Sequence, residues 1–401
     1  MGIWGKLFER AKARVFFTYG GAIGRARFNK ELYEQVTIRS VIDCIATHTA
    51  KAEALHIIVD ENERIKEVQR NSPYAKMLNM SPNPYMTGYD FKYKLITHVE
   101  KNTTALAWIQ WDGMKPKMMV PIAYSSFDIF PIVGGGYAVQ FVYDGESYTL
   151  NLEDMVVLRK FFNRYDISGD GNSAIYPTLD MMHAANEGLV EALTVSNKVR
   201  GLLKQKKAML DPEDVKKSTD EFAAQFEEAA KKGGVVGVDS TAEYTPLTAN
   251  TWAANAAQMK DIRENILRYW RISEPILTSN YTESQWQAFY ESVIEPRLLQ
   301  MSQAFTVACF TPTERGHGNR IAFNTSTLMH TSIQTKINIL SASRELGLFT
   351  TNELRDMFGY PPVEDGDTRK VSLNYVNADK QNEYQLGEKE GSEKDGEEEL
   401  T

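Results

Sequence analysis

Apolar residues recur three or four positions apart through two neighbouring stretches of the chain, and this spacing is typical of one face of a helix. A break at Ser273–Pro275 is predicted to end the first helix, because proline cannot donate a backbone hydrogen bond. Thr282 and Gln285 have the form of a capping box that opens the second helix. The pattern predicts a helical hairpin with arms at 253–271 and 283–305, joined through a polar loop that contains Thr278–Tyr281. The apolar positions are Met259, Ile262, Ile266, Leu267 and Trp270, then Trp286, Phe289, Val293, Ile294, Leu298, Leu299, Met301 and Phe305.

Before this hairpin, the period of the pattern changes from helical to extended. Helical spacing covers 31–58, a short helix is predicted from Ser72, and Thr87 is placed to cap a third helix. Runs rich in β-branched and aromatic residues follow, separated by Asp-Gly and Gly-rich turns, which are strong hairpin signals. These runs are 105–111, 127–133, 137–143 and 155–159. We therefore expect one antiparallel sheet flanked by helices, which is the α+β class.

Two long helical patterns flank a short segment of mixed character. The first is expected from Ala174 to about Leu203, and the second is the first arm of the hairpin. Between them, Asp211 and Pro212 mark the start of a polar helix that ends at Gly233. Short strands at 235–238 and 243–247 complete a small predicted α/β insert. Beyond the hairpin we expect a strand at 320–324, a helix at 331–346 and a short helix within 348–359.

Charge is distributed unevenly along the 401 residues, whose formal net charge is −8. Residues 1–30 hold seven basic residues and one acid, whereas residues 377–401 hold nine acids and three lysines. The acidic tail has few apolar residues and is expected to be disordered. The basic arm mixes apolar and basic positions, which favours an arm that docks on a neighbouring subunit or stays mobile. Binding to a membrane surface is the sharper alternative. No apolar run reaches the roughly 18 residues of a transmembrane helix.

The familiar sequence signatures of catalysis and metal binding are absent. No phosphate-binding loop with its lysine occurs, and the six histidines lack the spacing of metal ligands. The segment from Asp166 resembles the start of a calcium loop, but Pro177 stands where the bidentate glutamate belongs, which favours an ordinary turn. Cys44 and Cys309 are expected to be free thiols. We therefore predict a protein that is not an enzyme and that needs no cofactor or metal.

Signals for nucleic-acid binding are indirect. A surface loop with solvated charges is the ordinary interpretation of the polar loop and of the cations that precede it. A ring that repeated these groups around a bore would not need strong contacts with DNA, and weak contacts would permit sliding. The cations along the first hairpin helix are Lys260, Arg263, Arg268 and Arg271.

The order of these pieces resembles that of the portal proteins of tailed double-stranded DNA bacteriophages, and most closely those of long-tailed phages. The similarity covers about residues 30–376. The glycine that the family has before its Val-Pro turn is missing here, and the family's Gly-Asn-Ala-Tyr strand start is replaced by Asn102–Ala105. These departures concern loop conformations rather than the assignment. The matching segments are Met77–Asn79, Ser81–Thr87, Asp154–Arg159, Gly171–Ile175, Gln258–Trp270, Ile272–Leu277, Glu295–Pro296, Arg344–Gly347, Thr351–Arg355, Gly359–Val363 and Gly366–Asp367.

The resemblance implies a plan of domains and site residues. It predicts a basic arm (1–30), a wing (31–172), a first stem helix (173–203), a clip (204–248), a second stem helix (249–271), a tunnel loop (272–285) with its following helix (to 305), a strand returning to the wing (306–330), a helical crown (331–376) and the tail (377–401). The DNA-channel residues it implies are Thr278, Ser279, Asn280, Tyr281, Thr282 and Arg271. The partner-docking residues it implies on the clip are Lys216, Lys217, Glu227, Lys231 and Lys232.

The function implied is a ring, typically of twelve subunits, at one capsid vertex of a virion that is assembled in the host cytoplasm. Double-stranded DNA would pass non-specifically through the bore during packaging and ejection. The major capsid protein, the large terminase and a head–tail adaptor would be partners, with no membrane involved. Two alternatives stay open: an oligomeric structural or scaffold protein without a DNA bore, and a metal-dependent nuclease fused to a helical domain.

Overall fold

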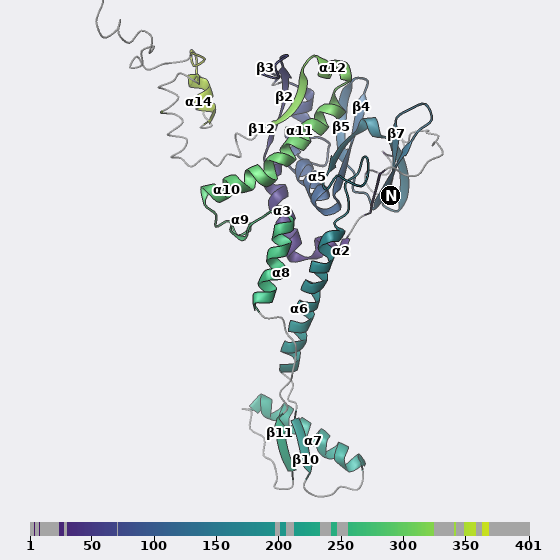
Figure 1. The fold of residues 1–401 in the computed structure, drawn as a ribbon, viewed down its shortest axis with the longest axis vertical. Coiled ribbons are helices and arrows are strands. Elements are labelled where there is room, and N and C mark those ends of the chain that lie inside the picture. Colours follow the sequence, from purple (N-terminus) through teal and green to yellow (C-terminus); the bar gives the residue numbers. More distant parts are fainter. Residues whose placement is uncertain are drawn as a thin grey trace, which may run out of the picture.

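The computed structural model describes residues 4, 8, 24–27, 30–69, 71–196, 201–205, 212–232, 242–246, 256–324, 341, 349–357 and 363–368. Figure 1 shows a body of helices and sheets from which α6 (Tyr176–Ser196) and α8 (Ala256–Tyr269) extend side by side, with a small unit beyond their far ends. The strand expected at 235–238, the acidic tail and nearly all of the helix expected at 331–346 lie outside the described residues.

The body contains three antiparallel sheets, where the sequence predicted one. Their strand orders are β1-β6-β7-β8, β5-β4-β9 and β12-β2-β3. The predicted Asp-Gly turns do join β4 to β5 and β7 to β8, and Gly113 and Gly145 have the positive φ that such turns need. This mixture of helices and antiparallel sheets agrees with the α+β class. The strands are β1 (Gly24–Arg27), β2 (Glu53–Val59), β3 (Ile65–Val68), β4 (Thr104–Asp112), β5 (Lys115–Pro121), β6 (Ser126–Pro131), β7 (Tyr137–Tyr143), β8 (Glu146–Asn151), β9 (Met155–Arg159) and β12 (Asn319–Asn324).

The helix expected over 31–58 is shorter than predicted. It consists of α2 (Lys30–Glu34) and α3 (Val36–Ala50), and the chain then continues as strand β2 from Glu53. The β-branched run Ile57–Val59 is suited to a strand, and β2 pairs with both β12 and β3. These neighbours lie elsewhere in the sequence, so the apolar spacing alone did not show where the helix ends.

A packed group of helices forms the centre of the body. α3, α5 (Gly88–Asn102) and α11 (Glu295–Cys309) contribute fully buried residues such as Ile42, Phe91 and Phe305 to one large apolar cluster. The predicted cap of α5 is confirmed, because the Thr87 side chain accepts from the Asp90 backbone N–H and Asp90 accepts from that of Thr87. Two short helices, α4 (Pro73–Asn79) and α12 (Pro312–Gly316), flank this core.

The second arm of the hairpin is not one regular helix. It starts as α10 (Glu283–Phe289), passes through a π-helical turn (Tyr290–Ile294) and continues as α11. Pro296 has no N–H to donate to the preceding turn, and wider turns of this kind accommodate such a gap. The predicted capping box at Thr282 is confirmed, because its side chain accepts from the Gln285 backbone and Gln285 accepts from the Thr282 backbone.

The unit beyond α6 and α8 begins earlier than the sequence suggested. α6 was expected to run to about Leu203, but Gly201–Gln205 forms strand β10, which pairs with β11 (Ala242–Pro246). Glycine disfavours a helix interior, and the pairing with a distant strand decides the conformation. The same unit contains α7 (Pro212–Lys232), whose proline stands in the first turn as predicted.

Two residues of the basic arm dock on their own chain, where the sequence favoured docking on a neighbouring subunit or a mobile arm. Trp4 packs edge-on against Tyr85, with ring centroids 5.3 Å apart. Phe8 is fully buried against four further aromatic rings, those of Trp108, Phe141, Tyr143 and Tyr148. Complementary rings on β4, β7 and β8 explain this attachment.

Three smaller features complete the fold. The short helix predicted within 348–359 is α14 (Thr351–Met357), and it starts with a reciprocal cap between Thr350 and Glu353. Cys44 and Cys309 are free thiols, and burial raises the pKa of Cys44 to about 11. In the described part of the chain, no helix is both long and apolar enough to cross a bilayer.

Candidate functional site

The predicted channel loop begins at the end of α8. Arg271 adopts the left-handed conformation with φ 57°. Its backbone N–H donates to the Arg268 carbonyl, and that of Ile272 donates to the Leu267 carbonyl. This pair of bonds defines a Schellman cap, in which glycine normally occupies the left-handed position. The helix therefore ends through this cap at Arg271, before the Ser273–Pro275 break to which the sequence assigned its end.

A second cap of the same type follows eight residues later. Glu274 and Pro275 open a short helix, α9 (Glu274–Leu277), so proline acts here as a first-turn residue rather than a terminator. Ser279 then takes φ 59°, its N–H donates to the Ile276 carbonyl, and the Asn280 N–H donates to the Pro275 carbonyl. Two helix ends within one short loop thus use left-handed residues that are not glycine.

Replacing Arg271 with glycine is expected to raise the free energy of unfolding by roughly 0.5–1 kcal/mol. Glycine has no Cβ to strain in the left-handed region, although its freer unfolded state offsets part of the gain. Chemical denaturation at fixed protein concentration measures the change. Ser273, which is extended at φ −100°, provides the control, because Ser273→Gly should bring no gain. Equal or lower stability of the Arg271→Gly variant would contradict the assigned strain.

The far side of the loop is held by aromatic stacking. The half-buried ring of Tyr281 stacks on Trp286 of α10, with centroids 5.4 Å apart and planes 28° apart. Trp286 is itself buried and packs edge-on against the His48 ring of α3, with ring centroids 4.7 Å apart. Thr278, Ser279, Asn280 and Thr282 are exposed. The loop therefore offers hydroxyl and amide groups to solvent from a backbone fixed at both ends.

Most cations near the loop already have acidic partners. Lys260 and Arg268 both reach Glu264, at 3.8 and 3.1 Å, and Arg263 reaches Glu274 at 3.5 Å. Arg271 is exposed and makes no ion pair within the described residues. Residues 256–285 contain four basic and four acidic side chains, so their formal net charge is zero. The surface can contact phosphates, but it attracts them weakly.

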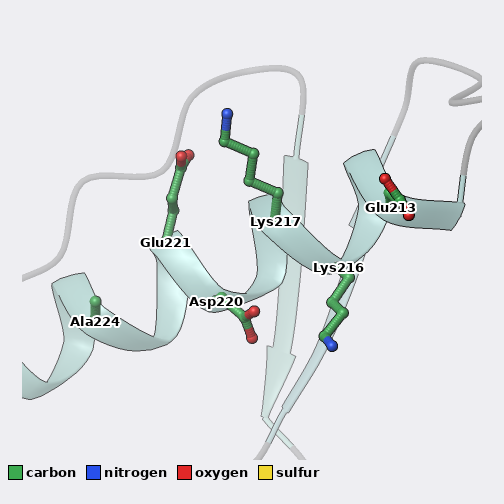
Figure 2. A pocket seen from close by; sticks show the side chains of 6 residues that line it. All are labelled: Glu213, Lys216, Lys217, Asp220, Glu221 and Ala224. Atoms are coloured by element: carbon green, nitrogen blue, oxygen red, sulfur yellow. The ribbon is translucent and has the colours of Figure 1, made fainter.

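The predicted docking residues lie on α7, far along the chain from the loop. Lys216 and Lys217 are exposed and line an open groove of about 540 Å³ together with Glu213, Asp220, Glu221 and Ala224. Figure 2 shows Lys217 and Glu221 projecting to one side of the helix and Lys216 and Asp220 to the other. Glu227, Lys231 and Lys232 belong to the same helix, and their side chains lie outside the described residues. This surface presents both signs of charge.

The described residues of the loop and of α7 do not form a metal site. Among the described residues, no three His, Cys, Asp or Glu side chains gather closely enough to hold a metal ion. The loop contributes hydroxyl, amide and guanidinium groups, which suit hydrogen bonds to phosphate oxygens.

A buried ionic cluster beside the loop was not predicted from the sequence. The fully buried carboxylate of Glu100 accepts from Lys160 Nζ at 2.6 Å and from Arg297 Nε at 2.8 Å. Burial alone would raise the pKa of Glu100, but these two cations hold it below its usual value. Glu100 lies on α5, Lys160 directly follows β9 and Arg297 lies on α11, so no local sequence pattern could have joined them.

Known proteins share both sequence and fold with this chain. A family model described as "Phage portal protein" matches residues 36–359. The probable portal protein of Lactococcus phage p2 is 26% identical over 207 residues, which are 49% of this chain and 53% of that protein. The chain thus matches about half the length of this curated relative. The portal protein of Enterobacteria phage HK97 is 20% identical over 380 residues, 89% of this chain and 86% of that protein.

Chains from gene transfer agent particles have a similar fold. One, from the neck of an empty particle computed with C6 symmetry, is 16% identical with a TM-score of 0.61, over 83% of this chain and 92% of that one. Another, from the neck of a native particle computed with C12 symmetry, is 14% identical with a TM-score of 0.59, over 90% and 100%. The family model favours the portal resemblance over the scaffold and nuclease alternatives. Because it covers most of the chain, the chain belongs to the phage portal protein family.

Proposed function

We propose that this chain forms a closed ring at one vertex of a phage capsid and conducts double-stranded DNA during packaging and ejection. The observation that carries the proposal is the loop 271–282. It has an exposed polar surface, an arginine with no ion pair among the described residues and a backbone held by two helix caps, in a chain of the portal family. A fixed loop of weak phosphate contacts suits a passage that must not hold its cargo.

The stem offers a surface for neighbouring copies. Met181 and Leu189 of α6 are 50% and 43% exposed, and a groove of about 450 Å³ between α6 and α8 is lined mainly by small and polar residues. Exposed apolar groups on a long helix favour burial against another subunit. We propose twelve subunits, in keeping with the C12 symmetry applied to the neck of the native gene transfer agent particle.

The unit that carries α7 is proposed to be the clip, with the body as the wing. Its exposed charges of both signs suit partners that bind in turn, since a mixed surface can pair with either sign. We assign the large terminase and then a head–tail adaptor to this surface, and contact with the major capsid protein to the wing. Residues 331–376 are proposed as the crown. The ring would act as a passive conduit without catalysis, assembled in the host cytoplasm and retained in the virion.

Deleting Ser279–Thr282 is expected to leave rings intact and to reduce DNA-filled particles roughly tenfold, because the deletion removes the repeated phosphate contacts around the bore. The measurement counts nuclease-protected DNA per particle, with ring assembly followed by electron microscopy. Deleting Gly134 and Gly135 from the β6–β7 turn is the control, since a Cβ added at either glycine would meet no atom within 4 Å. Filled particles at the normal level, or rings lost together with the DNA, would refute the role of the loop.

A further inference from the structure

Lys160 occupies an unusual position at the end of β9. Its side chain is 9% exposed, and its ammonium donates to the fully buried Glu100 of α5. The same carboxylate accepts from Arg297 of α11, so two cations share one anion inside the body. This leaves positive charge that Glu100 alone does not neutralise.

Three aromatic rings surround the same ammonium. Lys160 Nζ lies 4.9 Å from the ring centroid of Phe161 and 5.4 Å from those of Tyr269 and Trp270. The faces of aromatic rings carry negative potential and attract cations, most strongly where water is excluded. The rings therefore supply the stabilisation that the shared carboxylate lacks.

Two of these rings belong to the end of the returning stem helix. Tyr269 is the last residue of α8, and Trp270 directly precedes the left-handed cap at Arg271. The hydroxyl of Tyr269 also donates to Asn172 Oδ1, while Asn172 Nδ2 donates to the backbone carbonyls of Glu100 and Lys101. One buried centre thus ties the start of the loop to α5, β9 and α11.

The residue after Lys160 has a strained backbone conformation. Phe161 takes φ 54°, a conformation that is rare for a bulky residue. Its ring packs on Tyr269 with centroids 5.4 Å apart, and its carbonyl accepts from the Asp170 N–H. The strained conformation places the Phe161 ring against the end of α8, so the fold holds it at a cost.

We propose that Lys160 is a positioning residue, which fixes the end of α8 and thereby the conformation of the loop 271–282. Its ammonium does so by donating to Glu100 and by contacting the rings of Phe161, Tyr269 and Trp270. The consequence for DNA rests on the function proposed above, whereas the positioning itself does not. Lys160 touches no DNA in this proposal and acts only through the backbone that it holds.

Hydrogen exchange on the full-length protein, resolved to peptides that span the loop, tests the proposal. The Lys160→Met variant removes the ammonium, and the N–H groups of Ile272 and Asn280 should then exchange roughly tenfold faster, because the caps open locally. A matched pair of variants serves if Lys160→Met does not fold. Tyr269→Leu removes the ring and should speed exchange, whereas Tyr269→Phe keeps the ring, loses only the hydroxyl bond to Asn172 and should speed exchange much less.

Lys92 is the control for general loss of stability. It is another buried lysine, 4% exposed, which donates to the Ala52 carbonyl at 2.5 Å and lies outside the cluster around α8. Lys92→Met should leave exchange in the loop unchanged. Unchanged loop exchange in Lys160→Met, equal acceleration in Lys92→Met, or equal rates in the two Tyr269 variants would overturn the proposal. Because no DNA is present, such a result would not bear on the conduit function.

Discussion

Replacing Glu100 with leucine is expected to lower the free energy of unfolding by about 3–5 kcal/mol, because breaking a buried ion pair leaves an uncompensated charge in the interior. Here two charges lose their partner, since Lys160 and Arg297 both donate to Glu100, and the aromatic rings near Lys160 carry no formal negative charge to replace it. Urea denaturation followed by circular dichroism measures the change. The change would appear as a lower urea concentration at the unfolding midpoint, with a similar dependence of the unfolding free energy on urea.

A matched control separates burial from residue type. Glu67 on β3 is exposed, and Glu67→Leu should change the free energy of unfolding by less than about 0.5 kcal/mol.

Replacing Glu100, Lys160 and Arg297 together with apolar residues of similar size should recover much of the stability lost in Glu100→Leu, because no charge would then be buried. A Glu100→Leu variant as stable as the wild type would show that the cluster does not hold the body together.

The same cluster predicts a dependence on pH. The pKa of Glu100 is held below its usual value of 4.5, so below that pH the unfolded chain takes up a proton that the folded chain resists. Stability from this group is therefore present above pH 4.5 and is lost as the pH falls toward the lower folded pKa. Glu100→Gln removes this contribution and should give a flatter profile of unfolding free energy on the acid side. Identical acid profiles would contradict the assignment.

Replacing Phe8 with alanine is expected to release the basic arm from the body. Phe8 is fully buried against four aromatic rings, and removing such a side chain costs about 3–5 kcal/mol. Because the anchor lies near one end of the chain, the loss should appear as local release rather than global unfolding. Trypsin cleavage within the first 14 residues should accelerate by at least about 100-fold, because the open state becomes that much more populated.

Phe162→Ala provides the comparison for the arm, because Phe162 is 53% exposed and its removal should not change cleavage of the first 14 residues. Mass spectrometry of the digest assigns each cut. An arm that stays as protected in Phe8→Ala as in the wild type would mean that other contacts hold it.

Several parts of the fold could be predicted from the sequence because their signals are local. The Thr282–Gln285 and Thr87–Asp90 capping boxes lie within four residues, and both form as expected. The Asp-Gly turns before β5 and β8 also form as expected, since the conformation of a tight turn depends on the residues within it. The approximate position of the loop between α8 and α10 follows from these signals.

The rest depended on partners far apart in the sequence. Strand β10 replaces the end of a predicted helix because it pairs with β11, about 40 residues later. The Glu100 cluster joins residues 60 and 197 positions apart, and no periodic pattern records such a contact. Ser279 was predicted to lie in the loop and Arg271 at the end of the first helix, but their left-handed conformations could not be predicted, because glycine is the usual sequence signal for such caps.

Electron microscopy of the purified protein, with top views classified by symmetry, tests the central claim most directly. We expect closed rings of twelve subunits, with a central hole wide enough for duplex DNA and the loop 271–282 facing that hole. Closed particles without a bore, or rings in which this loop faces outward, would contradict it.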